Sequence, residues 1–244
     1  MTELDHYLAH HYLDETQLAA AAAMTMEEID ALIQARLVPA PAYVVDASGN
    51  LCSFVFGVMA APGSRAGRYF PPSQLAWIAV ALHALAEGPE TAPARLQAQF
   101  ASRYGAALAT LNLTTWRLRD SFDDRGAPIA EGLRARTDSA WTYFLNGTFS
   151  LCVANPMSEA HIAWKEVLQE KLAQQSGNGS KTLFSQAQAL FSQAQAQQMH
   201  ALIDAYAAAA MPFSPIEYAL SSRKRLVEDL RANLRVSDAQ ETPA

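Results

Sequence analysis

The chain has few of the features that mark secreted or membrane-spanning proteins. Its 244 residues include only two cysteines, Cys52 and Cys152, and they are not in CxxC spacing. Reduced thiols are therefore expected rather than a disulfide framework. No uncharged apolar run reaches roughly 18–20 residues, the length that crosses a bilayer. The first residues lack the basic and apolar segments of a signal peptide. These absences predict a soluble, cytoplasmic protein that does not act in a membrane.

The fingerprints of the commonest enzymes are also missing. The sequence contains no P-loop, dinucleotide glycine pattern, HExxH or GxSxG. His6, His10 and His11 gather near the start, but no carboxylate or cysteine completes an evident ligand set beside them. We therefore expect neither a metal nor a cofactor, and catalysis is not the leading hypothesis.

Positive charge is scarce in the first 58 residues, where Arg36 is the only lysine or arginine. The same segment carries these carboxylates: Glu3, Asp5, Asp14, Glu15, Glu27, Glu28, Asp30 and Asp46. The whole chain has a net charge of −6. A surface of this sign repels phosphate, so nucleic-acid binding is not expected.

The order of elements in this acidic segment is nevertheless that of a winged helix-turn-helix. A short helix is expected over 12–19, and a second helix ends near Arg36, with Thr25 and Glu28 in a capping box. Strand-like runs over 43–45 and 51–58 then flank a turn. The helix order and the Leu-Val-Pro exit resemble the DNA-binding domain of mercury-resistance-type regulators. That resemblance implies DNA reading, although the second helix lacks the arginines of those regulators.

The rest of the chain favours the helical period. A loop over 60–72, rich in proline and glycine, is the candidate domain boundary. Helices are expected over 74–87, 93–111, 114–118, 128–145, 158–172 and 215–235, and a short strand or extended loop over 148–153. The predicted fold is mainly α, with a winged-helix-like module (1–60) and its β-hairpin packed on a multi-helix domain (68–236). A frayed tail follows over 237–244.

One segment is a perfect tandem repeat, in which the heptad LFSQAQA of residues 183–189 recurs over 190–196. Seven residues are nearly two helical turns, so the copy rotates by only about 20° and lands on the same face. The repeat predicts a lengthened helix with an unbroken buried stripe. A coiled-coil partner is the alternative.

Two groups of residues are candidates for ligand binding. Trp116, Arg117 and Arg119 form a locally basic region that can hold a carboxylate or phosphate, or can pair with neighbouring carboxylates on the surface. The second group follows a turn and consists of Cys152, Asn155, His161 and Lys165. Cys152 and His161 are a candidate nucleophile and base, although a thiol among apolar neighbours is usually buried and inert.

A further candidate is Arg223, in a run of three cations over 223–225. Its alternative reading is a solvated helix face. Arg223 is included with the ligand-binding candidates.

Several segments together resemble a bacterial family of unknown function whose members are labelled as natural-product biosynthesis proteins. The resemblance rests on LVPAPAY (37–43), GTFSLCV (147–153), Lys165-Glu166, and FSP (213–215) leading to SSR (221–223). It implies that the gene lies near genes for biosynthetic enzymes. The leading hypothesis is a non-catalytic accessory or small-ligand-binding protein with a small-molecule or protein partner, and a homodimer is compatible with the sequence. The alternatives are a transcriptional regulator and an enzyme using Cys152 and His161.

Overall fold

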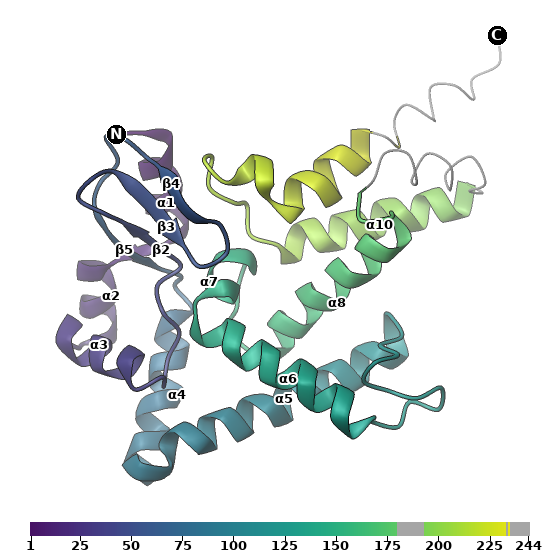
Figure 1. Cartoon of the computed structure of the whole chain (residues 1–244), viewed down its shortest axis with the longest axis horizontal. Helices are drawn as coiled ribbons and strands as arrows, with labels where there is room; N and C mark the ends of the chain where they lie inside the picture. Colours follow the sequence, from purple (N-terminus) through teal and green to yellow (C-terminus); the bar gives the residue numbers. More distant parts are fainter. Residues whose placement is uncertain (180–192, 233, 235–244) are drawn as a thin grey trace.

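The structure, a computed structural model, describes residues 1–179, 193–232 and 234. Most of these residues are helical, which confirms the predicted mainly α class (Figure 1). The elements are α1 (Glu3–His11), β1 (Leu13–Asp14), α2 (Glu15–Ala22), α3 (Met26–Gln34), β2 (Tyr43–Val45), β3 (Asn50–Ser53), β4 (Gly57–Ala60), β5 (Gly67–Phe70), α4 (Gln74–Glu87), η1 (Pro89–Thr91), α5 (Ala92–Thr114), α6 (Ala130–Leu145), α7 (Thr148–Cys152), α8 (Glu159–Gln175), α10 (Gln193–Ala209), η2 (Tyr218–Leu220) and η3 (Lys224–Asp229). Among the described helices, none combines the length and hydropathy needed to cross a lipid bilayer.

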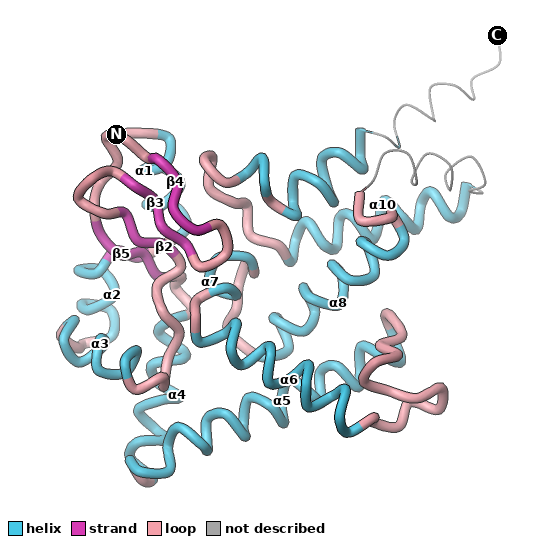
Figure 2. Tube along the Cα trace, in the orientation of Figure 1, coloured by secondary structure: helices cyan, strands magenta, loops and turns pink. Residues whose placement is uncertain are grey.

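The strands form one antiparallel sheet in the order β1-β5-β2-β3-β4, at one end of the molecule (Figure 2). The expected hairpin is present: β2 pairs with β3, and the Asp46 carboxylate accepts hydrogen bonds from the backbone of Ser48 and Asn50 in the turn. Gly49 closes that turn with a φ of 76°, which favours glycine. The helix-helix-hairpin order agrees with the prediction, whereas the winged-helix arrangement itself stays a prediction.

Two strand predictions were wrong. Residues 51–58 form two strands rather than one, because the chain reverses after Ser53 and Gly57 starts β4 with a φ of 73°. Residues 60–72 are not wholly loop, since β5 lies within them and pairs with both β1 and β2. The sequence of β5 does not look like that of an interior strand, although β5 lies between β1 and β2. It begins with a glycine followed by Arg68, whose charge is neutralised by residues distant in sequence.

The longest helices form the body of the protein and share a core with the sheet. Helix α5 packs against α4, α6 and α8, and α8 also packs against α10. The buried face of α5 repeats nearly every fourth residue, as Leu96, Phe100, Tyr104 and Leu108. One apolar cluster joins Tyr43 of the sheet to Phe144 of α6 and Val167 of α8. The expected helices over 74–87, 93–111, 128–145 and 158–172 are therefore confirmed.

Three other local predictions were wrong. Residues 148–152 form the short helix α7 instead of the expected strand or extended loop. The helix follows Gly147, whose φ is 83° and which leaves no room for a Cβ beside the Pro41 carbonyl (2.7 Å). Residues 115–118 lie in a loop, because α5 continues to Thr114. The segment after Pro215 is a 3₁₀ turn (η2) and a π-helix (η3) rather than one α-helix.

The break in the C-terminal helix has a tertiary cause. Glu217 has the spacing of a capping-box glutamate after Ser214, but its carboxylate accepts hydrogen bonds from Tyr43 Oη and Ser53 Oγ, both at 2.7 Å. The side chain thus joins the C-terminal segment to the sheet. The first copy of the heptad repeat, the first three residues of the second copy and the expected frayed tail lie outside the described residues.

Candidate functional site

Three adjacent hollows follow one face of α8. The inner hollow, about 300 Å³, lies beside Cys152, Lys165 and Arg225. The middle hollow, about 540 Å³, shares Tyr143, Phe149, Glu166 and Gln169 with it. The outer hollow, about 590 Å³, shares Asp120, Arg136 and Glu170 with the middle one. Because neighbouring hollows share walls, we call the three together the α8 groove.

Lys165 is the most unusual side chain of the groove because it is charged and 3% exposed. Its Nζ donates to Glu166 Oε1 (2.9 Å) and Gln169 Oε1 (2.6 Å) and lies 3.5 Å from Cys152 Sγ. Burial lowers the pKa of Lys165, but the Cys152 sulfur and the Glu166 carboxylate raise it more, so the net direction is upward. The ion pair with Glu166 therefore keeps Lys165 an ammonium ion.

Cys152 ends α7 and is 7% exposed. Burial raises the pKa of its thiol, and Lys165, although it acts in the opposite direction, does not reverse this. His161 is exposed near the start of α8, where its backbone N–H and its Nδ1 contact Ser158 Oγ. The structure therefore brings Cys152 and Lys165 together, as grouped from the sequence, and places His161 against Ser158 instead.

Arg225 was missed by the sequence analysis, which selected Arg223 from the same run. Arg223 donates to the carbonyls of Ala207 (2.5 Å) and Ala210 (2.7 Å), at the end of α10. Arg225 lines the inner hollow, its Nε is buried, and this atom has no hydrogen-bond partner among the described residues. An α-helical reading of the segment could not separate these two roles, since η3 is a π-helix with a different angular spacing.

Polar groups from α8, α10 and the C-terminal segment meet beside Lys165. The Tyr206 hydroxyl lies 2.8 Å from Ser222 Oγ and 3.2 Å from Gln169 Oε1. Burial raises the pKa of Tyr206, so this group is a neutral hydroxyl. The network fixes Gln169, and with it the second acceptor of the Lys165 ammonium.

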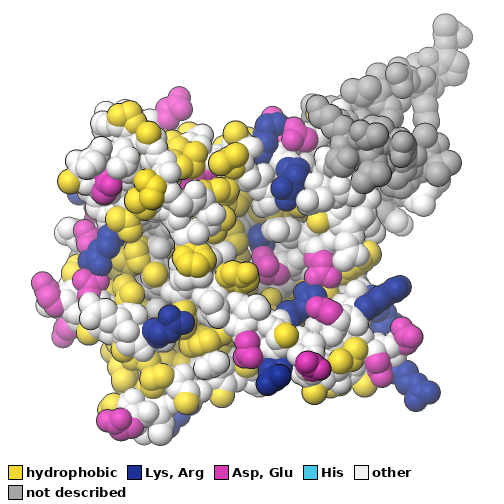
Figure 3. All heavy atoms as spheres, in the orientation of Figure 1, with side chains coloured by type: hydrophobic (Ala, Val, Ile, Leu, Met, Phe, Trp, Pro, Cys, Tyr) yellow, Lys and Arg dark blue, Asp and Glu magenta, His cyan; other side chains and the backbone are white. Residues whose placement is uncertain are grey.

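The remaining wall of the inner hollow is apolar and largely aromatic. Phe56, from the turn between β3 and β4, packs edge-on against Phe213 with ring centroids 5.8 Å apart, and Tyr143 packs edge-on against Phe149 at 6.4 Å. Val55 (43% exposed) and Leu220 (62% exposed) stand at the rim. Figure 3 shows hydrophobic side chains gathered between the sheet and the C-terminal segment on this face.

The basic region predicted around Trp116 forms the outer hollow. Trp116, Arg117 and Arg119 line it together with Arg136. Arg136 is paired with Asp120 (2.7 Å) and Glu170 (2.8 Å). Arg117 and Arg119 are exposed and make no ion pair with any described residue. The Trp116 indole Nε1 is buried without an acceptor in the described part of the chain.

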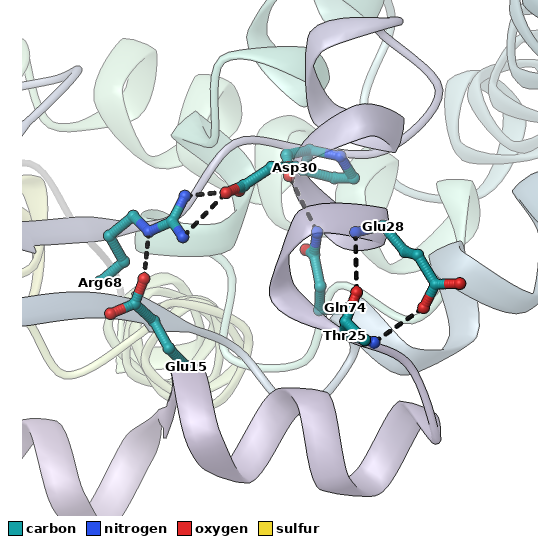
Figure 4. A network of polar contacts seen from close by, with 7 residues as sticks. Glu15, Thr25, Glu28, Asp30, Arg68 and Gln74 are labelled. Atoms are coloured by element: carbon teal, nitrogen blue, oxygen red, sulfur yellow. Dashed lines mark hydrogen bonds and ion pairs between the residues drawn. The ribbon is translucent and has the colours of Figure 1, made fainter.

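Part of the acidic N-terminal segment is neutralised by arginines that follow it in the sequence. Arg68 of β5 donates to Glu15 (2.5 Å) and to both oxygens of Asp30 (2.5 and 3.1 Å), as Figure 4 shows. Arg65 pairs with Asp14 at 3.3 Å. Arg65 and Arg68 therefore form ion pairs with carboxylates and do not form a positive ridge on α3. The exposed face of α3 carries Glu27 and Glu28.

Two other sequence candidates lie away from the groove's charged groups. Asn155 is exposed, and its carbonyl accepts a hydrogen bond from the Met157 N–H. His10 and His11 pack ring to ring, with centroids 4.6 Å apart. Across the described ranges, no three His, Cys, Asp or Glu side chains are grouped as metal ligands.

The chain belongs to a family of unknown function, DUF6058, which matches it over residues 96–235. Neither the curated proteins nor the solved structures compared with the chain include a match. The family segment begins within α5 and includes η3, so it contains Cys152, Lys165, Arg225 and the outer hollow. Phe56 and the N-terminal module lie outside it.

Proposed function

We propose that this protein binds a small organic anion with an apolar body, held in the inner hollow. The observation that carries the proposal is Arg225, a cation in the wall of an aromatic hollow that makes no ion pair with any described residue. A carboxylate on the ligand neutralises this guanidinium and forms charge-assisted hydrogen bonds with it.

The charges of the inner hollow favour an anion over a neutral ligand. Lys165 is neutralised by Glu166 at 2.9 Å, whereas no described carboxylate pairs with Arg225. One negative charge on the ligand therefore balances the positive charge of Arg225 in the hollow. The rings of Phe56, Phe213 and Phe149 provide the apolar surface that the body of such a ligand would cover.

Binding is a better account of this hollow than catalysis through Cys152. A reactive cysteine needs a lowered pKa and access to solvent, whereas Cys152 is 7% exposed and burial raises its pKa. The resemblance to natural-product biosynthesis proteins suggests the context: an accessory protein whose ligand is an acidic intermediate of a bacterial pathway. The acidic face of α3 disfavours the alternative, a DNA-binding regulator.

Calorimetric titration with octanoate and octanamide tests the proposal, because these probes share a chain and differ in charge. Octanoate is expected to bind about tenfold or more tightly than octanamide. Arg225→Met should weaken octanoate binding by about 10- to 100-fold, the usual value of a hydrogen bond to a charged group, and leave octanamide unchanged. Arg125→Met, at an exposed arginine outside the groove, is the control. Equal binding of both probes, or no effect of Arg225→Met, would contradict the proposal.

A further inference from the structure

Two arginines at the far end of the α8 groove make no ion pair within the described part of the chain. Arg117 and Arg119 line the outer hollow without an ion pair to any described residue, although Asp120 and Glu170 line it too. Both of those carboxylates are occupied by Arg136. The outer hollow therefore has an excess of positive charge on a chain whose net charge is −6.

We propose that the outer hollow binds a phosphate group, and that this group and the carboxylate in the inner hollow belong to one elongated ligand. This inference rests on the proposed function. Arg117, Arg119 and Arg136 face only Asp120 and Glu170 in this hollow, which leaves one net positive charge. A phosphate suits the outer hollow better than a carboxylate because its three terminal oxygens offer acceptors to both exposed guanidinium groups. Arginine forks also match phosphate oxygens in pairs.

The course of α8 sets the length of the ligand. Lys165 marks the inner hollow and Gln174 the outer hollow. These residues are nine positions apart in one helix, a rise of about 14 Å. Glu166, Gln169, Glu170 and Ala173 line the stretch between them, at the spacing of one helical face.

The middle hollow fits an uncharged chain. Apart from Arg136, its α6 wall consists of the small residues Gly132, Ala135, Ser139 and Ala140, with Tyr143 at the inner end. The charged groups of this hollow are paired within the protein, since Arg136 bridges Glu170 and Asp120, and Glu166 pairs with Lys165. The ligand class is therefore a carboxylate and a phosphate joined by an uncharged arm that spans about 14 Å.

Calorimetry with three probes tests this inference: dodecanoate, 12-phosphonododecanoate and 6-phosphonohexanoate. The first has only the carboxylate, the second has both groups at either end of a long chain, and the third has both groups too close together. We expect 12-phosphonododecanoate to bind about tenfold or more tightly than dodecanoate, and 6-phosphonohexanoate to show no such gain.

Two double variants distinguish binding in the outer hollow from a general effect of the protein's positive charge. Arg117→Ala with Arg119→Ala should abolish the gain of the long phosphonate and leave dodecanoate binding unchanged. Arg125→Ala with Arg134→Ala removes the same charge from exposed positions outside the groove and should preserve the gain.

The outcomes distinguish this inference from the proposed function. If dodecanoate binds through Arg225 but the long phosphonate gains nothing, the inference is overturned and the proposed function stands. If the long phosphonate depends on Arg117 and Arg119 but not on Arg225, the outer hollow binds phosphate alone, and both the proposed function and the single elongated ligand are overturned. If no probe binds, both are overturned.

Discussion

Replacing Glu217 should destabilise the protein more than replacing any exposed carboxylate, because three hydroxyl groups depend on it. Its oxygens accept hydrogen bonds from Tyr43 and Ser53 at 2.7 Å and from Ser214 at 3.0 Å. Tyr43 and Ser214 are both 0% exposed, so water cannot replace the lost acceptor. A buried polar group left without its partner costs about 1–3 kcal/mol. Glu217→Ala is therefore expected to cost about 3–5 kcal/mol, or roughly 10 °C in Tm for a chain of this size.

The pH dependence of this effect has a definite sign. Burial raises the pKa of Glu217, while its hydrogen bonds to Ser53, Tyr43 and Ser214 lower it, and the net direction is upward. The folded state therefore keeps the proton to a higher pH than the unfolded chain does. The resulting stabilisation is complete below the unfolded pKa and is lost as pH rises through the folded pKa. Glu217→Gln does not titrate, so its stability relative to the wild type should increase as pH rises across that window.

Urea unfolding followed by circular dichroism measures the free energy of unfolding of each variant and its dependence on pH. Glu228→Ala is the matched control, because Glu228 accepts a hydrogen bond from Tyr218 and pairs with Lys224, but its side chain is 54% exposed. This substitution should lower the free energy of unfolding by less than about 1 kcal/mol. The reasoning is refuted if Glu217→Ala costs no more than Glu228→Ala. It is also refuted if the stability difference between wild type and Glu217→Gln does not change with pH.

Two further predictions concern the groove. A Cβ on Gly132 would lie 1.7 Å from the Asp120 carbonyl oxygen, so Gly132→Ala should lower the free energy of unfolding by about 3 kcal/mol or more. Gly105→Ala is the control: its nearest contacts lie at 4.0 Å, so it should stabilise α5 by about 0.5–1 kcal/mol. Equal effects of the two substitutions in thermal unfolding would disprove the packing described around the middle hollow. Iodoacetamide should label partly exposed Cys52 about tenfold faster than buried Cys152 in the native protein, and both after denaturation. Peptide mass spectrometry would show faster labelling of Cys152 if it were an activated nucleophile.

The sequence predicted those elements whose causes are local. The capping box of α3 is present in both directions: Glu28 N–H donates to Thr25 Oγ1 at 3.2 Å, and Thr25 N–H donates to Glu28 Oε2 at 2.8 Å. The long helices follow their apolar period, and the turn at Gly49 follows its residue types. Cys152 and Lys165, which were grouped from the sequence, are in contact because only residues 153–158 connect α7 to α8.

The sequence could not predict features that depend on residues far apart in the chain. The capping-box spacing at Ser214 and Glu217 is the same local signal as in α3, but Tyr43 and Ser53 divert the carboxylate. The sequence did not show that part of the acidic segment is neutralised, because Arg68 lies beyond that segment and reaches Glu15 and Asp30 only after β5 joins the sheet. Arg225 was passed over because its place in the groove depends on the π-helical spacing of η3.

The ion pairs along α8 make the length of this helix a strict requirement. An insertion of one residue between Glu166 and Gln169 would turn everything after it by about 100°. Glu170 would then leave Arg136, and Gln169 would leave Lys165, so that the two ends of the groove would face different sides of the protein. Helices in this family should therefore vary in length at their ends, and α8 should keep the number of residues between Lys165 and Glu170.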